Sequence, residues 1–505
     1  MATEKRLLLA LALSFVVVAA WTRFFARPPS PQNPQDYPQQ VIKQQPALPA
    51  LEKTVEPLVC LTDFEFQNHR AALVFAEPWG AVRHAIFSKY QDYKFSLSRG
   101  LLVGFTDMEF YRQAYDNKGV TYNFSDKEKE IIKDISVGDT EYTFDLVLKV
   151  KNTSSAPLLI QLPVTLGMMD MAATKDRMNF HDVTVSDRER TFYPNPKKAA
   201  TFSNVNFIAM RDRYFCAIIQ PLQKGSSGFI NKVADNNYDV GLILPEVTLD
   251  PGQVWEQQFR VYIGPQDTKI LKNANPDWQA VVYFGRFDLI AQALLVFLDF
   301  LYRLVNNWGW TIVILSFSIY LLVYPLTLKQ MRSMKEMQVL QPQVEELRKL
   351  HKSNPQRMNK EIMELYKAHK VNPLGGCLPM VLQIPIFFAL YQVLSRTVAL
   401  KGADFLWIKD LSEPDKLFIL PNTFPVIGNQ VNILPILMAI GMFFQQKTSM
   451  VSVSQNQAEQ QKIMMIVMPV MFGVLFYHMP SGLVLYWFIN SSLTLAYQLR
   501  VSRKK

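Results

Sequence analysis

The sequence is poor in the residues that build metal and redox sites. It has only three cysteines and six histidines in 505 residues. Cys60, Cys216 and Cys377 lie far apart and form no C-x-x-C pair. No two histidines have the H-x-x-x-H spacing that would put both on one helical face for zinc. We therefore expect no metal site and no cofactor.

The motifs of nucleophilic and nucleotide-dependent catalysis are also missing. The chain contains neither a G-x-S-x-G sequence nor a Walker loop. Asp170, His181 and Ser186 lack any spacing that is typical of a catalytic triad. We do not expect an enzyme.

Apolar residues, in contrast, are abundant. They make up 49% of the chain, whose mean hydropathy is +0.03, and this is high for a wholly soluble protein. The formal net charge is +10, but the basic residues concentrate in particular loops, which favours membrane topology over nucleic-acid binding. Part of the chain should therefore lie in lipid.

Residues 1–26 are expected to form an N-terminal membrane anchor, because two basic residues precede an apolar run there. Small residues ending at Ala20 would allow cleavage as a signal peptide, whereas Trp21, directly after the run, favours an uncleaved anchor. Residues 27–54 are rich in proline and glutamine and predict a linker that cannot bury a core.

Residues 55–272 are expected to form a soluble all-β domain. Phe144, Leu146 and Leu148 alternate with polar residues, which is the pattern of a half-buried strand. Turn signals such as residues 250–252 (Asp-Pro-Gly) separate such runs. This arrangement predicts a sandwich of antiparallel sheets.

The remainder of the chain predicts membrane helices. Residues 285–306 are apolar at helical spacing but include Asp288, Asp299 and Arg303, which favours an amphipathic helix in the membrane interface. Five candidate spans follow within residues 307–500. They are Trp308–Leu328, Leu374–Leu394, Val431–Gln445, Ile463–His478 and Gly482–Leu499.

Loop charges orient these spans. The segment 329–372 and the C-terminus are basic and should be cytoplasmic, whereas the loop 397–430 balances its lysines with acids, as expected outside. The β-domain should therefore lie outside the membrane, with both termini in the cytoplasm.

Residues 329–372 predict a helical hairpin, because each arm has one apolar stripe and residues 353–355 (Ser-Asn-Pro) give a turn. Its other faces are basic. They are either solvated surfaces or a docking surface for anionic lipid, ribosomal RNA or another acidic partner. The candidate docking residues are Arg348, Lys349, Lys352, Arg357 and Lys360.

Polar residues lie in helical register inside several candidate spans. They either join the helices by hydrogen bonds or line a polar groove that is open to lipid. The candidate groove residues are Ser316, Tyr320, Gln383, Tyr486, Asn490 and Thr494.

The candidate span Ile463–His478 carries a methionine stripe, which is either plain core or an adaptable hydrophobic slide for varied partners. We assign Phe387 of the candidate span Leu374–Leu394 to the same slide. The methionines are Met464, Met468 and Met471.

Several short sequences in residues 285–500 resemble, in the same order, those of the YidC family of membrane protein insertases. They are Y-P-L-T at 324–327, N-P-L-G-G-C-L-P at 372–379, Q-I-P-I-F at 383–387 and P-S-G-L-V-L-Y-W at 480–487.

The N-terminal layout resembles the Gram-negative type of this family. The resemblance implies a multi-pass protein of the inner membrane, with a periplasmic β-supersandwich and a five-helix core. It further implies a groove that is open to the cytoplasm and to lipid. The implied partners are nascent membrane proteins, the Sec translocon, the ribosome and anionic lipids.

One position departs from the family. The second span of the family usually carries an arginine where this chain has Tyr320, so attraction of acidic substrate tails should be weaker. Two accounts stay open, a hydrogen-bonding substitute or a degenerate paralogue with a structural role. We favour the first and expect insertion with less dependence on substrate charge. A transporter or channel, and a carbohydrate-binding module, are the rival functions.

Overall fold

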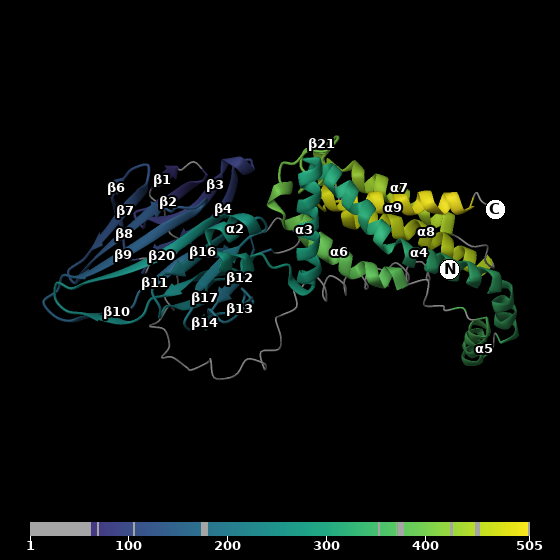
Figure 1. Ribbon diagram of the computed structural model, residues 1–505, viewed down its shortest axis with the longest axis horizontal. Coiled ribbons are helices and arrows are strands. Elements are labelled where there is room, and N and C mark those ends of the chain that lie inside the picture. The colour runs from purple at the N-terminus through teal and green to yellow at the C-terminus, as the bar shows by residue number, and fades with distance from the viewer. Residues whose placement is uncertain are drawn as a thin grey trace. The chain divides into compact units, whose positions relative to one another are not determined.

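The computed structural model describes residues 62–67, 70–104, 107–172, 180–351, 354–369, 371, 378–424, 428–449 and 455–502 (Figure 1). These residues divide into two compact units, one that ends at Tyr283 and one that begins at Phe284. The predicted anchor (1–26), the predicted linker (27–54) and Lys352 lie outside the described residues.

The first unit, called the β-unit below, is built from antiparallel sheets. A nine-stranded sheet packs against a five-stranded sheet through contacts of β11 with β15 and β16. The nine-stranded sheet has, in spatial order, β13 (Thr191–Phe192), β12 (Asp182–Ser186), β15 (Phe207–Arg211), β16 (Phe215–Pro221), β20 (Val254–Pro265), β9 (Thr143–Asn152), β8 (Lys129–Val137), β7 (Gly119–Ser125) and β6 (Tyr111–Tyr115). The five-stranded sheet has β14 (Ala200–Phe202), β17 (Ser227–Ala234), β18 (Asn237–Ile243), β11 (Pro163–Asp170) and β5 (Leu102–Val103).

Two smaller sheets complete the β-unit, and β4 of one of them also packs against β11. They are formed by β1 (Thr62–Gln67), β2 (Ala72–Glu77), β3 (Ala81–Phe87) and β4 (Tyr93–Gly100), and by β10 (Leu158–Ile160) with β19 (Val247–Leu249).

The period-two pattern of the sequence accounts for the core of this unit. On β9, the side chains of Phe144, Leu146, Leu148 and Val150 are fully buried, whereas Lys149 between them is exposed. One face of the strand therefore packs into the sandwich and the other faces away. The β-rich fold predicted for this region is confirmed.

Charged side chains are buried in the β-unit with partners. The guanidinium of Arg99 lies 2.6 Å from the carboxylate of Asp239. Burial raises the pKa of Asp239 to about 6, although Arg99 opposes the rise. Lys133 is also buried, and its ammonium donates to the carbonyl oxygens of Gly80 (2.5 Å) and Leu101 (2.6 Å). Burial lowers the pKa of Lys133 to about 7.

The β-unit continues past residue 272 to Tyr283. Helix α2 (Thr268–Ala274) and a 3-10 helix (Pro276–Val281) form this end, and both pack inward because Leu271 and Trp278 are fully buried. Asp267 caps α2 by accepting from two backbone N–H groups of its first turn.

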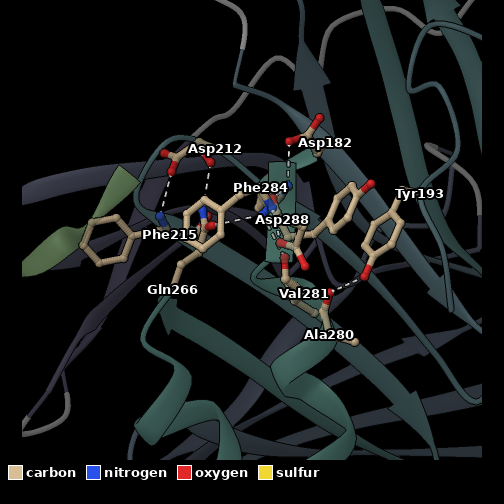
Figure 2. A network of polar contacts seen from close by, with 11 residues as sticks. Asp182, Tyr193, Asp212, Phe215, Gln266, Ala280, Val281, Phe284 and Asp288 are labelled. Atoms are coloured by element: carbon tan, nitrogen blue, oxygen red, sulfur yellow. Dashed lines mark hydrogen bonds and ion pairs between the residues drawn. The ribbon is translucent and has the colours of Figure 1, made fainter. Parts of the chain in front are cut away.

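Arg211 on β15 holds this end in place (Figure 2). Its guanidinium donates to the carbonyl oxygens of Val281 (2.8 Å) and Tyr283 (2.7 Å) and to the carboxylate of Asp182 (2.8 Å). The ring of Tyr193 also stacks on that of Tyr283, with centroids 3.8 Å apart. The last residues of the β-unit are thus fixed by both charge and packing.

The second unit, called the helical unit below, contains seven described α-helices and a β-hairpin. Helix α9 packs against α4, α6 and α7, while α3 packs against α4 and α6. The helices are α3 (Asp288–Val305), α4 (Trp308–Leu350), α5 (Pro355–Ala368), α6 (Leu378–Arg396), α7 (Ile433–Ser449), α8 (Gln455–Phe476) and α9 (Ser481–Ser502), and the hairpin is β21 (Phe418–Phe424) with β22 (Gly428–Val431).

Helix α4 is one continuous helix of 43 residues that joins the first predicted span to the first arm of the predicted hairpin. Asn307 caps its start by accepting from the backbone N–H of Trp310 (3.0 Å). Helix α5 packs against α4, and His351 at the end of α4 lies 2.7 Å from Glu361 of α5.

Among the described residues, one helical stretch, Trp308–Leu328 of α4, is long and apolar enough to cross a membrane. Met465–Phe476 of α8 is a shorter apolar stretch. Helices α6, α7, α8 and α9 occupy the other predicted spans, but α7 has 17 residues and is short for a bilayer core of about 30 Å. The number of spans therefore stays a prediction.

Many apolar side chains of the helical unit are exposed. On α4, Leu315 and Ile319 are buried, whereas Phe317 and Leu321 on the other side are more than half exposed. An apolar helix with an exposed apolar face is typical of a lipid-facing helix.

Candidate substrate groove

Three of the six predicted groove residues, Gln383, Tyr486 and Asn490, lie in one hydrogen-bonded network, called the Tyr486 network below. The hydroxyl of Tyr486 on α9 accepts from the amide of Gln383 on α6 (2.8 Å) and lies 3.4 Å from the amide nitrogen of Asn490. Thr494 lies on the same face of α9, but its hydroxyl donates to the backbone carbonyl oxygen of Asn490 (2.9 Å), one turn earlier on its own helix. Tyr486 is fully buried.

The local sequence explains this network. Tyr486, Asn490 and Thr494 are spaced four residues apart, so they share one face of α9. Gln383 reaches them because α6 packs against α9. Every side chain of the network is neutral, so the site offers hydrogen bonds without a fixed charge.

Ser316 on α4 is used differently. It is fully buried, and its hydroxyl donates to the carbonyl oxygen of Ile312 one turn earlier (2.6 Å). Ser318 makes the same kind of bond to Ile314 (2.8 Å). Such hydroxyls satisfy themselves on their own helix, so their presence in a span does not by itself indicate a shared groove.

Tyr320 belongs to a second cluster, formed by three tyrosines of α4 and α9. Its ring centroid lies 6.0 Å from that of Tyr324, which in turn lies 5.4 Å from that of Tyr497 in an edge-on contact. The hydroxyl of Tyr320 is buried and has no hydrogen-bond partner among the residues that the structure describes. Tyr497 follows Thr494 by three residues and so lies on the same face of α9 as Tyr486, Asn490 and Thr494. This spacing is the sequence signal for the contact.

Phe387 lies in an aromatic cluster rather than beside a plain methionine stripe. Its ring contacts those of Trp487 on α9 (5.3 Å) and Phe476 on α8 (6.0 Å), and Phe472 packs against Trp487 (5.7 Å). The sequence analysis did not single out Trp487, Phe476 or Phe472. The only sequence signal for them was the spacing of Phe472 and Phe476, two aromatic residues four positions apart.

The methionines of the predicted slide lie on the same helix, α8, as two of these aromatic residues. Met468 and Met471 are partly exposed. The side chain of Met464 lies outside the described residues.

The four predicted docking residues that the structure describes are exposed, but two of them are paired with acids. Arg357 lies 2.9 Å from Glu361, and Lys360 lies 4.0 Å from Glu364, both one turn along α5. Hydrogen bonding from Arg357 lowers the pKa of Glu361. Arg348 and Lys349 are exposed at the end of α4. The surface is therefore less positive than its count of basic residues indicates.

Buried polar contacts close one end of the helical unit. The carboxylate of Asp415 accepts from the first two backbone N–H groups of α7, at 2.9 and 3.0 Å. Asn432 donates to the carbonyl oxygen of Tyr477 (2.7 Å), and Ser481 donates to that of Asp410 (3.0 Å). Asp415, Asn432 and Ser481 are all buried.

Within the described ranges, no group of three or more histidine, cysteine, aspartate or glutamate side chains is arranged to hold a metal ion.

Both units match family models. Residues 105–297 match the model described as the YidC periplasmic domain, and residues 300–505 match the model described as the 60Kd inner membrane protein. A solved structure described as an active YidC insertase with the first transmembrane domain resolved is also similar. It is 19% identical, with a TM-score of 0.41, and the match covers 86% of this chain and 92% of that chain.

Two relatives match along their whole length, and both are named membrane protein insertase YidC. The protein of Syntrophobacter fumaroxidans is 32% identical, and the match covers 99% of this chain and 100% of the relative. The protein of Geotalea daltonii is 30% identical, with 99% of each chain covered. The chain belongs to the YidC family of membrane protein insertases.

Proposed function

We propose that this chain is a membrane protein insertase, which guides nascent membrane proteins into the inner membrane. Its family supports this function. The single observation that carries the proposal is the Tyr486 network, a set of neutral polar groups that joins α6 to α9 around the fully buried Tyr486, in a unit with many exposed apolar side chains.

The physical basis of insertion is desolvation. A nascent helix carries a polar flanking segment, and each unsatisfied polar group costs several kcal/mol in hydrocarbon. Amide and hydroxyl groups both donate and accept hydrogen bonds. Gln383, Asn490 and Tyr486 would therefore satisfy polar groups of the passing segment partway across the membrane.

The apolar part of the substrate would then leave the groove sideways into lipid. The aromatic cluster around Phe387, together with Met468 and Met471, gives it an apolar surface of α6 and α8 to slide along. Transfer of apolar surface into lipid drives this step, so it needs no nucleotide.

The proposed topology has the anchor and five spans in the membrane, the β-unit in the periplasm, and the α4–α5 hairpin and both termini in the cytoplasm. Exposed basic residues of the hairpin, Arg348 and Lys349 among them, support its cytoplasmic location. The same surface would bind anionic lipid or the ribosome, and the Sec translocon is a further proposed partner. The buried contacts of Asp415 and Asn432 would close the groove on the periplasmic side.

The groove of this chain would select substrates less by charge. Tyr320 brings a ring and an unpartnered hydroxyl where an arginine would bring a fixed charge. Purified protein in liposomes, given short substrates with acidic or neutral tails, should insert both at similar rates. Tyr320→Arg should restore a preference for acidic tails. A strong acidic preference of the unaltered protein would contradict this proposal.

The insertase function itself is tested by complementation. Cells that are depleted of their own insertase should grow when they express this chain or its Tyr320→Arg variant. Growth with the variant alone would indicate a degenerate paralogue, and growth with neither, at normal protein levels, would contradict the proposed function.

A further inference from the structure

The hairpin of β21 and β22 has an unusual surface for a loop element. Phe418 is 61% exposed, Ile419 is 73% exposed and Phe424 is 47% exposed. The sequence has no charged residue from position 417 to position 446, which includes the whole hairpin and most of α7. A two-stranded hairpin that faced water would be expected to carry charges and to hide such side chains.

Both faces of the hairpin expose a large apolar side chain. Phe418 and Ile419 are neighbours on β21, so their side chains point to opposite faces of the ribbon, yet both are more than half exposed. An isolated two-stranded hairpin is only marginally stable in water. A protein partner that docked on the hairpin would cover one face, whereas lipid surrounds both.

The hairpin is continuous with the apolar surface of α7. Strand β22 ends at Val431, and α7 begins at Ile433. On α7, Ile436, Ile440 and Phe444 are spaced four residues apart and are each nearly half exposed, so they form one apolar stripe. The exposed surface of the hairpin thus leads directly into a helix face that is suited to lipid.

The base of the hairpin is held firmly, so its direction is fixed. The backbone N–H of Leu417 donates to the carbonyl oxygen of Val431 (3.0 Å), and that of Lys416 donates to the side chain of Asn432 (3.0 Å). Asn432 is fully buried and is bonded to Tyr477. The hairpin therefore projects from the closed end of the helical unit as a fixed element.

We propose that the β21–β22 hairpin is inserted into the interfacial layer of the adjacent lipid leaflet, where it anchors the closed end of the helical unit. Its open strand edges would be too costly in the hydrocarbon centre, but headgroups and water satisfy them in the interface. Uncharged polar residues of the hairpin, such as Asn422 and Thr423, suit the same layer. The inference needs the membrane location proposed above but does not need insertion activity.

Fluorescence of the full-length protein in liposomes tests this inference. Cys60 and Cys377 are replaced by serine, and an environment-sensitive dye is attached at Ile419→Cys, with Phe424→Cys as a second position. Lys409→Cys is the matched control, because Lys409 is an exposed charged residue of the same α6–α7 connection. Both substituted hairpin side chains are exposed, so their replacement should not disturb the fold.

Aqueous iodide should quench the dye at 419 and 424 several-fold less than at 409. Lipids that carry a spin label near the headgroup should quench it more than lipids labelled deep in the acyl chain. Equal iodide quenching at 419 and 409 would overturn the inference. Protection at 419 without quenching by any labelled lipid would also overturn it, because the hairpin would then be covered by a second copy of the protein.

Discussion

The two units bury polar groups in different ways. The β-unit buries charges and pairs them, as with Arg99 and Asp239. The Tyr486 network of the helical unit consists of neutral amides and hydroxyls. A buried charge that loses its partner costs several kcal/mol, so paired charges suit a domain that keeps one structure. Neutral groups exchange partners at lower cost, which suits a surface that receives many different chains.

The largest expected effect is on the buried ion pair of the β-unit. Arg99→Met leaves the Asp239 carboxylate buried without its cation, and should destabilise the β-unit by about 3–5 kcal/mol at neutral pH. Because Asp239 can then take up a proton, the loss should be smaller in acid than in weak base. Hydrogen exchange of β18 in the full-length protein measures the change.

An exposed ion pair of the same unit is the matched control. Lys149 and Glu256 lie 3.6 Å apart with both side chains exposed, so Lys149→Met should cost less than about 1 kcal/mol. Equal effects of the two substitutions would contradict the view that burial makes the first pair important.

Lys133 gives the next effect, which depends on pH. At low pH both the folded and the unfolded chain hold its proton, whereas above about pH 7 only the unfolded chain does, up to about pH 10. The unfolded state then binds more protons, so the free energy of unfolding should rise with pH by up to about 1.4 kcal/mol per unit. Urea unfolding at increasing pH should show a steeper rise for the unaltered protein than for Lys133→Met.

A smaller effect is expected in the Tyr486 network. Tyr486→Phe removes the acceptor for Gln383, and hydrogen bonds between membrane helices contribute about 0.6 kcal/mol on average. Tyr320→Phe is the control, because its hydroxyl has no partner and its loss should change stability less. We expect Tyr486→Phe, however, to slow insertion clearly. If Tyr486→Phe destabilised the protein as much as Arg99→Met does, this result would contradict the proposed difference between the two units.

The smallest effect is expected on the surface of α5. Arg357→Gln breaks an exposed pair with Glu361, and such pairs contribute little to stability because water and salt screen them. Thermal unfolding should therefore be almost unchanged. Binding of the variant to anionic liposomes should weaken slightly if this surface docks on lipid, and unchanged binding would speak against that role.

Sequence spacing predicted which residues share one face of a strand or helix. It did not predict which residues of other elements contact that face. The alternation of Phe144, Leu146 and Leu148 gave the buried face of β9 correctly. The four-residue spacing of Tyr486, Asn490 and Thr494 likewise gave one face of α9. The same reasoning could not separate Ser316, whose hydroxyl is satisfied on its own helix, from residues that bond across helices.

Contacts between distant residues required the structure. The positions of Phe387, Phe476 and Trp487 in the sequence did not predict that α6, α8 and α9 bring their rings into contact. The guanidinium of Arg211 reaches backbone carbonyl groups about seventy positions away in the chain, at Val281 and Tyr283, and backbone groups leave no mark in a side-chain pattern.

Helix α4 connects two distant parts of the helical unit as a single helix. At 1.5 Å per residue its 43 residues span about 65 Å, from the α3 end of the unit to the arm that packs on α5. Pro325 and Pro342 each remove a backbone hydrogen bond of the helix, so α4 bends most easily at these two positions. Pro325 directly follows Tyr324, so bending of α4 at this position would change the angle between the tyrosine rings of α4 and the ring of Tyr497 on α9.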